Sequence, residues 1–319
     1  MPTEVEGTHK IGDLSLYTKT WLVSFPSLLT RSPLTAVPKP DGTPKAKLIF
    51  VHGFNDHINR YYGLFPYLAS QGIATYGFDQ RGWGRSAATH AQQGLTGPTS
   101  LVISDIVSII RTQLPSSVPV FVAGHSMGGG EVLTLASDPK YEDVIAQIRG
   151  WILESPFIAF PKGFEPSFLK VFFGRLAGKL LPHMKLANPI PPENVSRDPE
   201  VVQSLTDDKL LHGNGTLEGL SSLLDRTAQL ESGEAKLSKS VKAVWIGCGT
   251  EDKGVSYQAC KKWFEAQTQL QDKEFKTYDG WYHQLHADLP DNRDVFPKDV
   301  AGFILARCEG GRVGDGSKL

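Results

Sequence analysis

"VFVAGHSMGGG", residues 120–130, is the stretch that decides the fold of this 319-residue chain. Its first part is a short apolar run, as expected of a strand that is buried on both faces of a sheet. Gly124-His125-Ser126-Met127-Gly128 follows at once and fits the pattern G-x-S-x-G. In so tight a turn, a side chain at either glycine would collide with neighbouring backbone. The stretch therefore predicts a strand, a turn that lifts the Ser126 hydroxyl out at the C-terminal edge of a sheet, and a helix.

The alternation of strand, turn and helix continues on both sides of this stretch. Parallel strands that are covered on both faces are short apolar runs separated by helical segments, and such an order predicts an α/β fold with helices on both faces of a mostly parallel sheet. "LSLYTKTWLV" (14–23) alternates only in part, which indicates a half-buried strand. The further runs that we interpret as buried strands are "KLIFVHG" (47–53), "IATYGFD" (73–79), "GWILESP" (150–156), "KAVWIGCG" (242–249) and "EFKTYDG" (274–280).

A long interruption divides the predicted strands. We expect 1–155 and 225–308 to form the two parts of one core, 156–224 to form a helical cap inserted between them, and 309–319 to be a flexible tail. Within the insertion, apolar residues recur at helical spacing, with four basic residues and no acid between Pro166 and Pro192. The stripe is expected to pack against the core as a cap, and peripheral contact with a membrane is the second possibility. It consists of Phe168, Phe172, Leu176 and Leu180, with Leu169, Phe173, Ala177 and Leu181 beside it.

Composition limits the classes of partner. The formal net charge is -1, so a nucleic-acid partner is not expected. Three widely spaced cysteines fit neither a disulfide framework nor a zinc pattern and suit a reducing compartment. The N-terminal residues do not match a secretory signal, and no apolar run approaches the roughly 18 residues of a membrane span.

The last residues suggest a location. The sequence closes "GGRVGDGSKL", and Ser317-Lys318-Leu319 matches the tripeptide that a peroxisomal import receptor reads. We therefore expect a peroxisomal protein with that receptor as a partner, and otherwise a cytosolic one. The alternative is that the tripeptide is an accidental polar tail.

A serine hydroxyl needs a histidine to take its proton and a carboxylate to orient that histidine. On G-x-S-x-G turns the acid and then the base follow the serine along the chain, on loops after later strands. Asp252 in "WIGCGTEDKG" and His283 in "TYDGWYHQLH" stand at such places. Asp252 is favoured because its turn directs the side chain towards the loop of His283, while Glu251 and Glu154 are the rival acids.

Two backbone N–H groups should receive the oxyanion that forms when Ser126 attacks a carbonyl group. Met127 offers one at the start of the helix, and Phe54 in "FVHGFNDH" offers the other. His52 and His125 are expected to be buried, hydrogen-bonded histidines that shape these loops, and not bases.

Together these segments resemble a known family. "HGFNDHINRYY" (52–62), "FDQRGWGRS" (78–86), "GHSMGGG" (124–130), "GTEDKG" (249–254) and "YDGWYHQLHADLP" (278–290) are similar, in order and spacing, to the monoacylglycerol lipases of the α/β-hydrolase superfamily. The resemblance covers about residues 14–306 and is weakest in the insertion. It implies a serine carboxylester hydrolase that needs no cofactor and acts on a lipid ester through an acyl-enzyme. The implied residues are the triad Ser126, Asp252 and His283, the oxyanion donors Phe54 and Met127, and a cap that shapes an acyl tunnel.

The resemblance also places Asp56, Arg60 and His286 at the head-group end of that tunnel. We expect His283 to be the base and His286 a polar wall of the leaving-group pocket. The alternative is that Asp56 and Arg60 form an ion pair that braces the oxyanion loop and that His286 lies on the surface. A metal site on the two histidines is least favoured, because no third ligand is apparent.

The chain departs from the family at two places, Glu154 and Cys248, and most of all in the cap. Chain length and head group of the substrate are therefore open. Rival functions are a peroxisomal esterase or acyl-thioesterase of fatty-acid or secondary metabolism, and a hydrolase-fold protein that binds without turnover.

Overall fold

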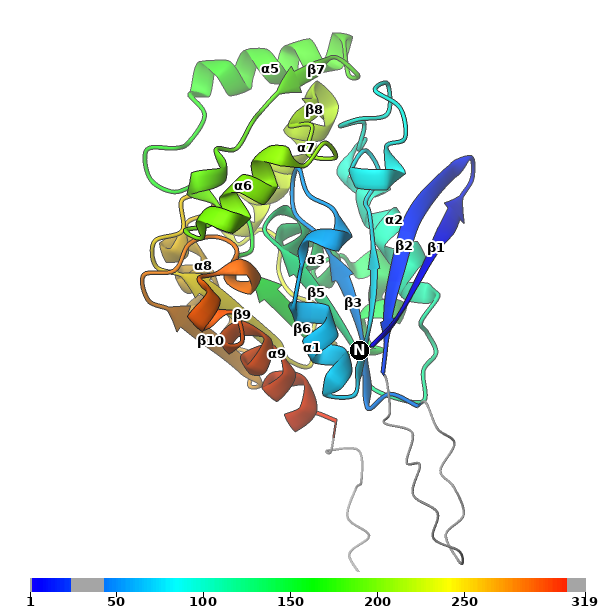
Figure 1. Ribbon diagram of the computed structural model, residues 1–319. Helices are drawn as coiled ribbons and strands as arrows, with labels where there is room; N and C mark the ends of the chain where they lie inside the picture. Colours follow the sequence, from blue (N-terminus) through cyan, green and yellow to red (C-terminus); the bar gives the residue numbers. More distant parts are fainter. Residues whose placement is uncertain (1, 24–42, 309–319) are drawn as a thin grey trace, which may run out of the picture.

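An eight-stranded sheet forms the centre of the computed structural model, which describes residues 2–23 and 43–308 (Figure 1). The strand order is β1-β2-β4-β3-β5-β6-β9-β10. β2 pairs antiparallel with both β1 and β4, and all other neighbours are parallel, which confirms the predicted mostly parallel sheet. The strands are β1 (Thr3–Ile11), β2 (Leu14–Leu22), β3 (Ala46–Val51), β4 (Ile73–Phe78), β5 (Val120–His125), β6 (Ile148–Glu154), β9 (Val244–Gly249) and β10 (Lys273–Tyr278).

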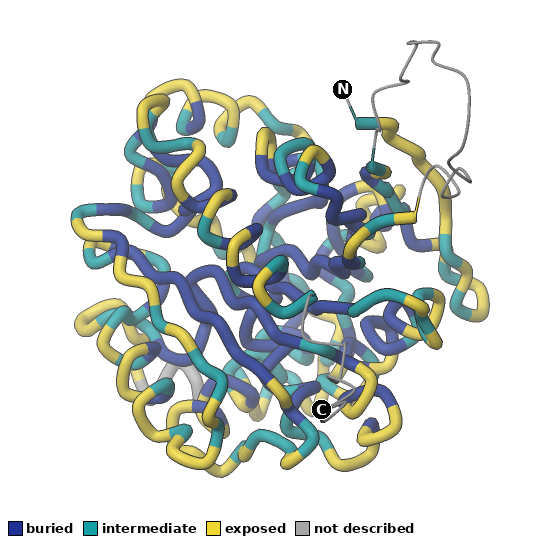
Figure 2. The backbone as a smooth tube through the Cα atoms, turned by 90° about the horizontal axis from the view of Figure 1, so that it is seen from below, coloured by how far each residue is buried: buried dark blue, intermediate teal, exposed yellow. Residues whose placement is uncertain are grey.

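Helices cover both faces of the sheet because each inner strand carries apolar side chains on both of its faces. In β3, Leu48 and Phe50 belong to one buried cluster, while Ile49 and Val51 belong to the other. Figure 2 shows the inner part of the sheet as buried tubes inside a partly exposed outer layer. The first cluster includes residues of α1 (Leu64–Ser70) and α9 (Val295–Ala306), and the second those of α2 (Thr99–Arg111), α3 (Met127–Ala136), α4 (Glu142–Ile145) and α8 (Tyr257–Ala266).

The two edges of the sheet differ from the sequence-based interpretation. β1 was not predicted, because as an edge strand it exposes most of its residues and carries no apolar run; it pairs with the whole of β2. β10 was interpreted as a buried strand, but it forms the opposite edge and exposes several of its residues. An edge strand needs only one partner, so its apolar pattern is weak.

The insertion lies over the C-terminal ends of the parallel strands (Figure 1). Helix α7 (Leu217–Ser232) continues without a break through residue 224, so the predicted end of the cap at that residue matches no end of an element. Among the described residues, no helix has the length and apolar character needed to cross a bilayer. The elements of the insertion are α5 (Phe168–Leu180), β7 (Lys185–Ala187), α6 (Pro199–Asp207), β8 (Asn214–Thr216) and α7 (Leu217–Ser232).

The predicted helix in the middle of the insertion is confirmed as α5, which packs on α7. Arg175 of α5 forms an ion pair with Asp225 of α7. The C-terminal part of the apolar stripe is not buried against the sheet domain, since Leu176, Leu180 and Leu181 are 52%, 78% and 56% exposed. The side chains of residues 168–173 lie outside the described part of the chain. The cap therefore presents apolar side chains to its surroundings.

Candidate active site

Ser126 occupies a strained turn between β5 and α3. Its φ of 55° lies in the left-handed region, which is uncommon for a residue other than glycine. The two glycines of the motif permit this turn: a Cβ at Gly124 would lie 2.5 Å from the Gly128 carbonyl oxygen, and one at Gly128 would lie 2.3 Å from the Val51 carbonyl oxygen. The predicted strand, turn and helix around the serine are confirmed.

His283 and Asp252 lie together after the last two strands. Nδ1 of His283 is 2.8 Å from Oδ2 of Asp252, and both side chains are buried. Oδ1 of Asp252 accepts hydrogen bonds from the backbone N–H groups of Gly254 and Val255. Burial alone would lower the pKa of His283, but the Asp252 carboxylate raises that pKa above its ordinary value of 6.5. The arrangement keeps the proton on Nδ1 and leaves Nε2 as a base.

Neither rival acid contacts His283. Glu251 is exposed on the turn beside Asp252. Glu154 is buried, and its carboxylate contacts His286 instead. The structure therefore brings Asp252, and not Glu251 or Glu154, to the histidine predicted as the base.

The predicted oxyanion loop lies next to Ser126. A Cβ at Gly53 would be 3.2 Å from the Ser126 Cβ, so the backbone before Phe54 runs against the serine, and Met127 is the first residue of α3. His52 holds this loop: its Nδ1 donates to the Gly53 carbonyl at 2.8 Å, and its Nε2 accepts from the Gln80 N–H at 2.9 Å. Burial lowers the pKa of His52, which suits the neutral, loop-shaping histidine that we expected.

A cavity of about 260 Å³ connects these residues. Ser126, His283 and Phe54 line it from the core, together with Asp56 and His125. The cap supplies most of the opposite wall, and much of that wall is apolar, which suits a hydrocarbon chain. The apolar residues of this wall include Ile190, Val195, Leu205 and Leu211.

Asp56 lines the cavity as predicted, but its carboxylate already has partners. Oδ1 accepts from the His57 N–H at 2.8 Å, and Oδ2 accepts from the Tyr61 hydroxyl at 2.7 Å. Burial by itself would raise the pKa of Asp56, yet His125 and His52 hold that pKa below its ordinary value. Nδ1 of His125 is 3.2 Å from the Tyr61 hydroxyl oxygen.

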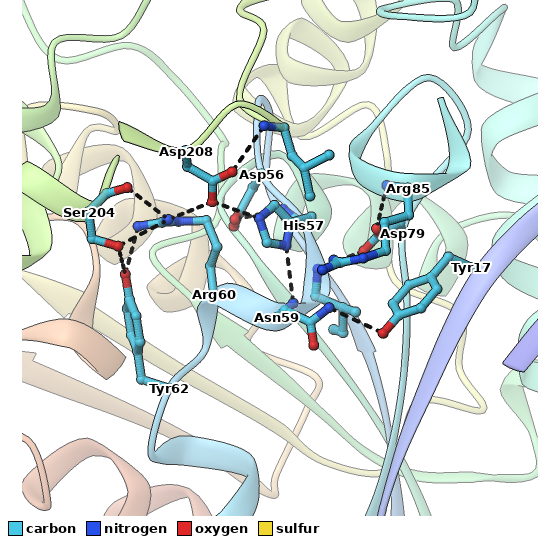
Figure 3. Close-up of polar contacts among 12 residues, drawn as sticks. Tyr17, Asp56, His57, Asn59, Arg60, Tyr62, Asp79, Arg85, Ser204 and Asp208 are labelled. Atoms are coloured by element: carbon cyan, nitrogen blue, oxygen red, sulfur yellow. Dashed lines mark hydrogen bonds and ion pairs between the residues drawn. The ribbon is translucent and has the colours of Figure 1, made fainter. Parts of the chain in front are cut away.

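The structure places Arg60 away from both expected positions. Its guanidinium does not line the cavity and does not pair with Asp56. One nitrogen donates to Asp208 at 2.9 Å and another to the Tyr62 hydroxyl at 2.6 Å, and His57 Nε2 is 2.8 Å from the same Asp208 oxygen (Figure 3). Asp208 follows α6 in the cap, so Arg60 joins the core to the cap.

The structure also places His286 away from both expected positions. Its side chain is fully buried, so it is neither a wall of the cavity nor a surface residue. Its Nδ1 is 2.7 Å from Oε1 of Glu154, and its ring lies on that of Tyr61 with 4.4 Å between the centroids. Sequence spacing alone does not show which strand end supplies the partner of a histidine.

Sequence reasoning missed Gln284. It lines the cavity directly after His283, and its Oε1 is buried without a hydrogen-bond partner among the described residues. A polar residue next to the predicted base in "YHQLH" was the available signal. Cys248 is fully buried, and burial raises the pKa of its thiol, so it behaves as the buried strand cysteine that we expected.

Comparison with known proteins agrees with this geometry. A family described as "Serine aminopeptidase, S33" matches residues 42–290. A Schizosaccharomyces pombe protein that carries monoglyceride lipase in its name is 32% identical over 263 residues, which cover 82% of this chain and 68% of that protein. The monoglyceride lipase of Mus musculus is 28% identical over 282 residues, covering 86% of this chain and 88% of the mouse protein.

Solved structures share the fold. A soluble variant of the Saccharomyces cerevisiae monoglyceride lipase superimposes with a TM-score of 0.79 at 19% identity, covering 96% of this chain and 97% of the yeast chain. The Paleococcus ferrophilus monoacylglycerol lipase gives a TM-score of 0.70 at 26% identity over 83% of this chain and 96% of its own. The chain therefore belongs to the S33 serine hydrolase family, as a monoglyceride lipase-like enzyme with the α/β-hydrolase fold.

Proposed function

We propose that the protein hydrolyses monoacylglycerols or closely similar lipid monoesters through an acyl-enzyme on Ser126. The observation that carries the proposal is one cavity that holds Ser126 on its strained turn, His283 bonded to Asp252, and an apolar wall from the cap. The names of the relatives support the substrate class.

The proposed reaction uses Ser126, His283 and the backbone N–H groups of Phe54 and Met127. His283 Nε2 takes the proton of the Ser126 hydroxyl as its oxygen attacks the ester carbonyl carbon, and the N–H groups of Phe54 and Met127 stabilise the oxyanion. His283 then gives that proton to the leaving alcohol. Water, activated by the same histidine, releases the fatty acid and restores Ser126.

The description of the family suggests a second activity, that of an aminopeptidase, but the cavity supports this activity less well. An aminopeptidase must bind the ammonium group of its substrate, and a free carboxylate is the ordinary partner for that charge. Asp56 is the one acid among the described residues that line the cavity, and both of its oxygens are already hydrogen-bonded. An uncharged acyl chain fits this lining better.

A hydrolysis panel with purified protein tests the proposal. It compares monoacylglycerols of graded length, short nitrophenyl esters, acyl-CoAs and an aminoacyl nitroanilide, with Ser126→Ala as the blank. We expect the highest kcat/KM for a monoacylglycerol. A preference for acyl-CoA would make the protein a thioesterase, and inertness on the whole panel would favour a binding role.

We also propose that the cap touches a lipid surface. Several of its apolar side chains are exposed, and Ile190 is at once 41% exposed and part of the cavity wall. A lipid monoester leaving a bilayer could then pass from an apolar surface into the cavity without crossing water. The other exposed apolar side chains of the insertion are Phe164, Leu176, Leu180, Leu181 and Met184.

For location we propose the peroxisome, with the import receptor as a partner. The proposal rests on Ser317-Lys318-Leu319, which lie outside the described residues. A fluorescent protein fused to the N-terminus should collect in peroxisomes, and removal of the three residues should release it to the cytosol. A diffuse signal with the tripeptide intact would contradict the proposal.

A further inference from the structure

Glu154 ends the strand that lies between those leading to Ser126 and to Asp252. It is the last residue of β6, and β6 pairs with β5, which leads to Ser126, and with β9, which leads to Asp252. Its backbone carbonyl accepts a hydrogen bond from the Ser126 N–H at 3.0 Å. The backbone of Glu154 therefore holds the strained turn of the serine.

The side chain of the same residue holds the loop of the base. Oε1 of Glu154 accepts two hydrogen bonds from His286, one from the backbone N–H at 3.0 Å and one from Nδ1–H at 2.7 Å. His286 lies three residues after His283, in the short helix Leu285–Ala287. One carboxylate oxygen thus fixes both the backbone and the ring of a residue within one turn of the base.

The surroundings of this pair are tightly packed. The centroid of the His286 ring is 5.4 Å from that of His125, and the centroid of the His125 ring is 4.8 Å from that of His283. On its other side, His286 lies on Tyr61. A shift of His286 would therefore disturb the packing of His125, whose ring in turn lies beside that of His283.

Burying a carboxylate for packing alone would be costly. Glu154 is 1% exposed, and an apolar side chain of similar size would fill that space without the loss of hydration. Burial would raise the pKa of Glu154, but the nearby imidazoles of His286 and His125 hold that pKa below its ordinary value. The charged form is thus the one that the site retains.

We propose that Glu154 is a positioning residue for the reaction, which sets the separation of Ser126 and His283 through its backbone carbonyl and its carboxylate. The proposal rests on the proposed use of Ser126 and His283 as nucleophile and base. Glu154 does not contact the reacting atoms; it acts through the two loops that carry them.

The test compares Glu154→Ala and Glu154→Gln with Glu251→Ala as the control, since Glu251 is an exposed acid next to Asp252. The readouts are kcat and KM for a short nitrophenyl ester, the rate at which a fluorophosphonate labels Ser126, and Tm. Glu154→Ala should lower kcat by roughly 10- to 100-fold with little change in KM, because a small displacement of the base reduces the rate without weakening substrate binding. Labelling of Ser126 should slow in parallel.

Glu154→Gln should recover most of the lost kcat, because its carboxamide oxygen still accepts from His286. Glu251→Ala should match the wild type. A folded Glu154→Ala enzyme with a lower Tm but wild-type kcat would overturn the proposal, because the residue would then serve stability alone.

Should Glu154→Ala not fold, His286→Phe gives the same test from the other side, since it keeps a ring against Tyr61 and removes the Nδ1 donor. Wild-type kcat in a folded His286→Phe enzyme would then overturn the proposal. The proposed function can fail independently of this proposal. If the wild type cleaves the short ester but no monoacylglycerol, the proposed substrate class is wrong, and the Glu154 variants still test the role of Glu154 on the short ester.

Discussion

His283 and His286 each place Nδ1 against a buried carboxylate, but only His283 lines the cavity with Ser126. The different tasks of the two imidazoles therefore follow from which side of the loop each ring occupies, and not from the type of partner. A carboxylate at Nδ1 fixes the tautomer in both cases. For His283 the free nitrogen is available to a substrate, whereas for His286 it is buried without a partner among the described residues.

The first prediction concerns the acid. Asp252→Asn should lower kcat by roughly 10⁴-fold, because an amide at this place favours the tautomer that carries its proton on Nε2. Glu251→Gln, one residue earlier and exposed, should stay within about twofold of the wild type. Steady-state kinetics with a short nitrophenyl ester checks both, and a larger loss in Glu251→Gln would transfer the role to that residue.

The second prediction concerns pH. The base must be neutral to take the serine proton, and Asp252 raises the pKa of His283 above 6.5. Activity should therefore be low at acidic pH and should rise with pH through a midpoint above 6.5. The measurement is kcat/KM for a soluble ester from about pH 5 to 9. A midpoint below the ordinary histidine value would mean that burial, and not Asp252, dominates the environment of the ring.

Residue-level prediction succeeded where a strand end fixes the position of a side chain. Ser126, Asp252 and His283 each follow a strand of the parallel sheet, so their convergence could be inferred from the sequence. Arg60 and His286 could not be placed in this way. Their partners, Asp208 and Glu154, come from the insertion and from an inner strand, and no local pattern connects such distant positions.

Among the elements, α3 and α7 meet at a buried ion pair. Glu131 of α3, five residues after Ser126, is 3.0 Å from Arg226 of α7, and both are nearly inaccessible. Burial raises the pKa of Glu131 to about 7 although Arg226 opposes the shift, and burial lowers the pKa of Arg226. Both directions indicate that lost hydration outweighs the attraction between the two charges.

The third prediction follows from that balance. Arg226→Met should destabilise the fold by roughly 3–5 kcal/mol, because Glu131 is left buried and unpaired. The loss should grow as pH rises through about 7, where the folded state disfavours the ionised carboxyl. Glu131→Leu combined with Arg226→Met should recover stability to within about 1 kcal/mol of the wild type or exceed it. Urea unfolding of the wild type, the single variant and the double variant at acidic and alkaline pH measures these free energies of unfolding.

The control for this experiment is an ion pair on the same helix. Arg175 and Asp225 join α5 to α7 at the surface, so Arg175→Met should cost about 1 kcal/mol or less. If Arg175→Met and Arg226→Met lowered the free energy of unfolding equally, burial of the Glu131–Arg226 pair would not be the cause of the loss.

The order of the inner elements could be predicted because each buried strand is a compact apolar run. The insertion could not be predicted in detail, since its helices pack on one another and on the core through contacts distant in sequence. Helix α7 illustrates the difficulty: Thr216 caps its start, Gly233 ends it, and nothing at residue 224 divides it. A boundary drawn from the end of a strand-helix pattern therefore fell inside a continuous helix.

At the scale of the whole molecule, the cap lies over the C-terminal ends of the parallel strands (Figure 1). It lines the cavity and also carries exposed apolar side chains such as Leu180 and Leu181. Asp208 connects this cap to Arg60 and His57 of the core, so the cap wall of the cavity is tied to the oxyanion loop. A cap in contact with a lipid surface would then bring lipid next to the cavity that Ser126 lines.

The last prediction tests this arrangement. Leu180→Ser combined with Leu181→Ser should weaken binding to phospholipid vesicles by roughly 10-fold or more, because each leucine that enters the interface contributes on the order of 1 kcal/mol. The same variant should lose activity on monoacylglycerol held in vesicles and keep its kcat/KM for a short soluble ester, since neither leucine lines the cavity. Val295→Ser, which changes an apolar residue 38% exposed at the start of α9, is the control for surface apolarity away from the cap. Vesicle sedimentation and the two activity assays give the answer. If the double variant binds vesicles as the wild type does, the exposed leucines serve another purpose and lipid must reach Ser126 by a different face.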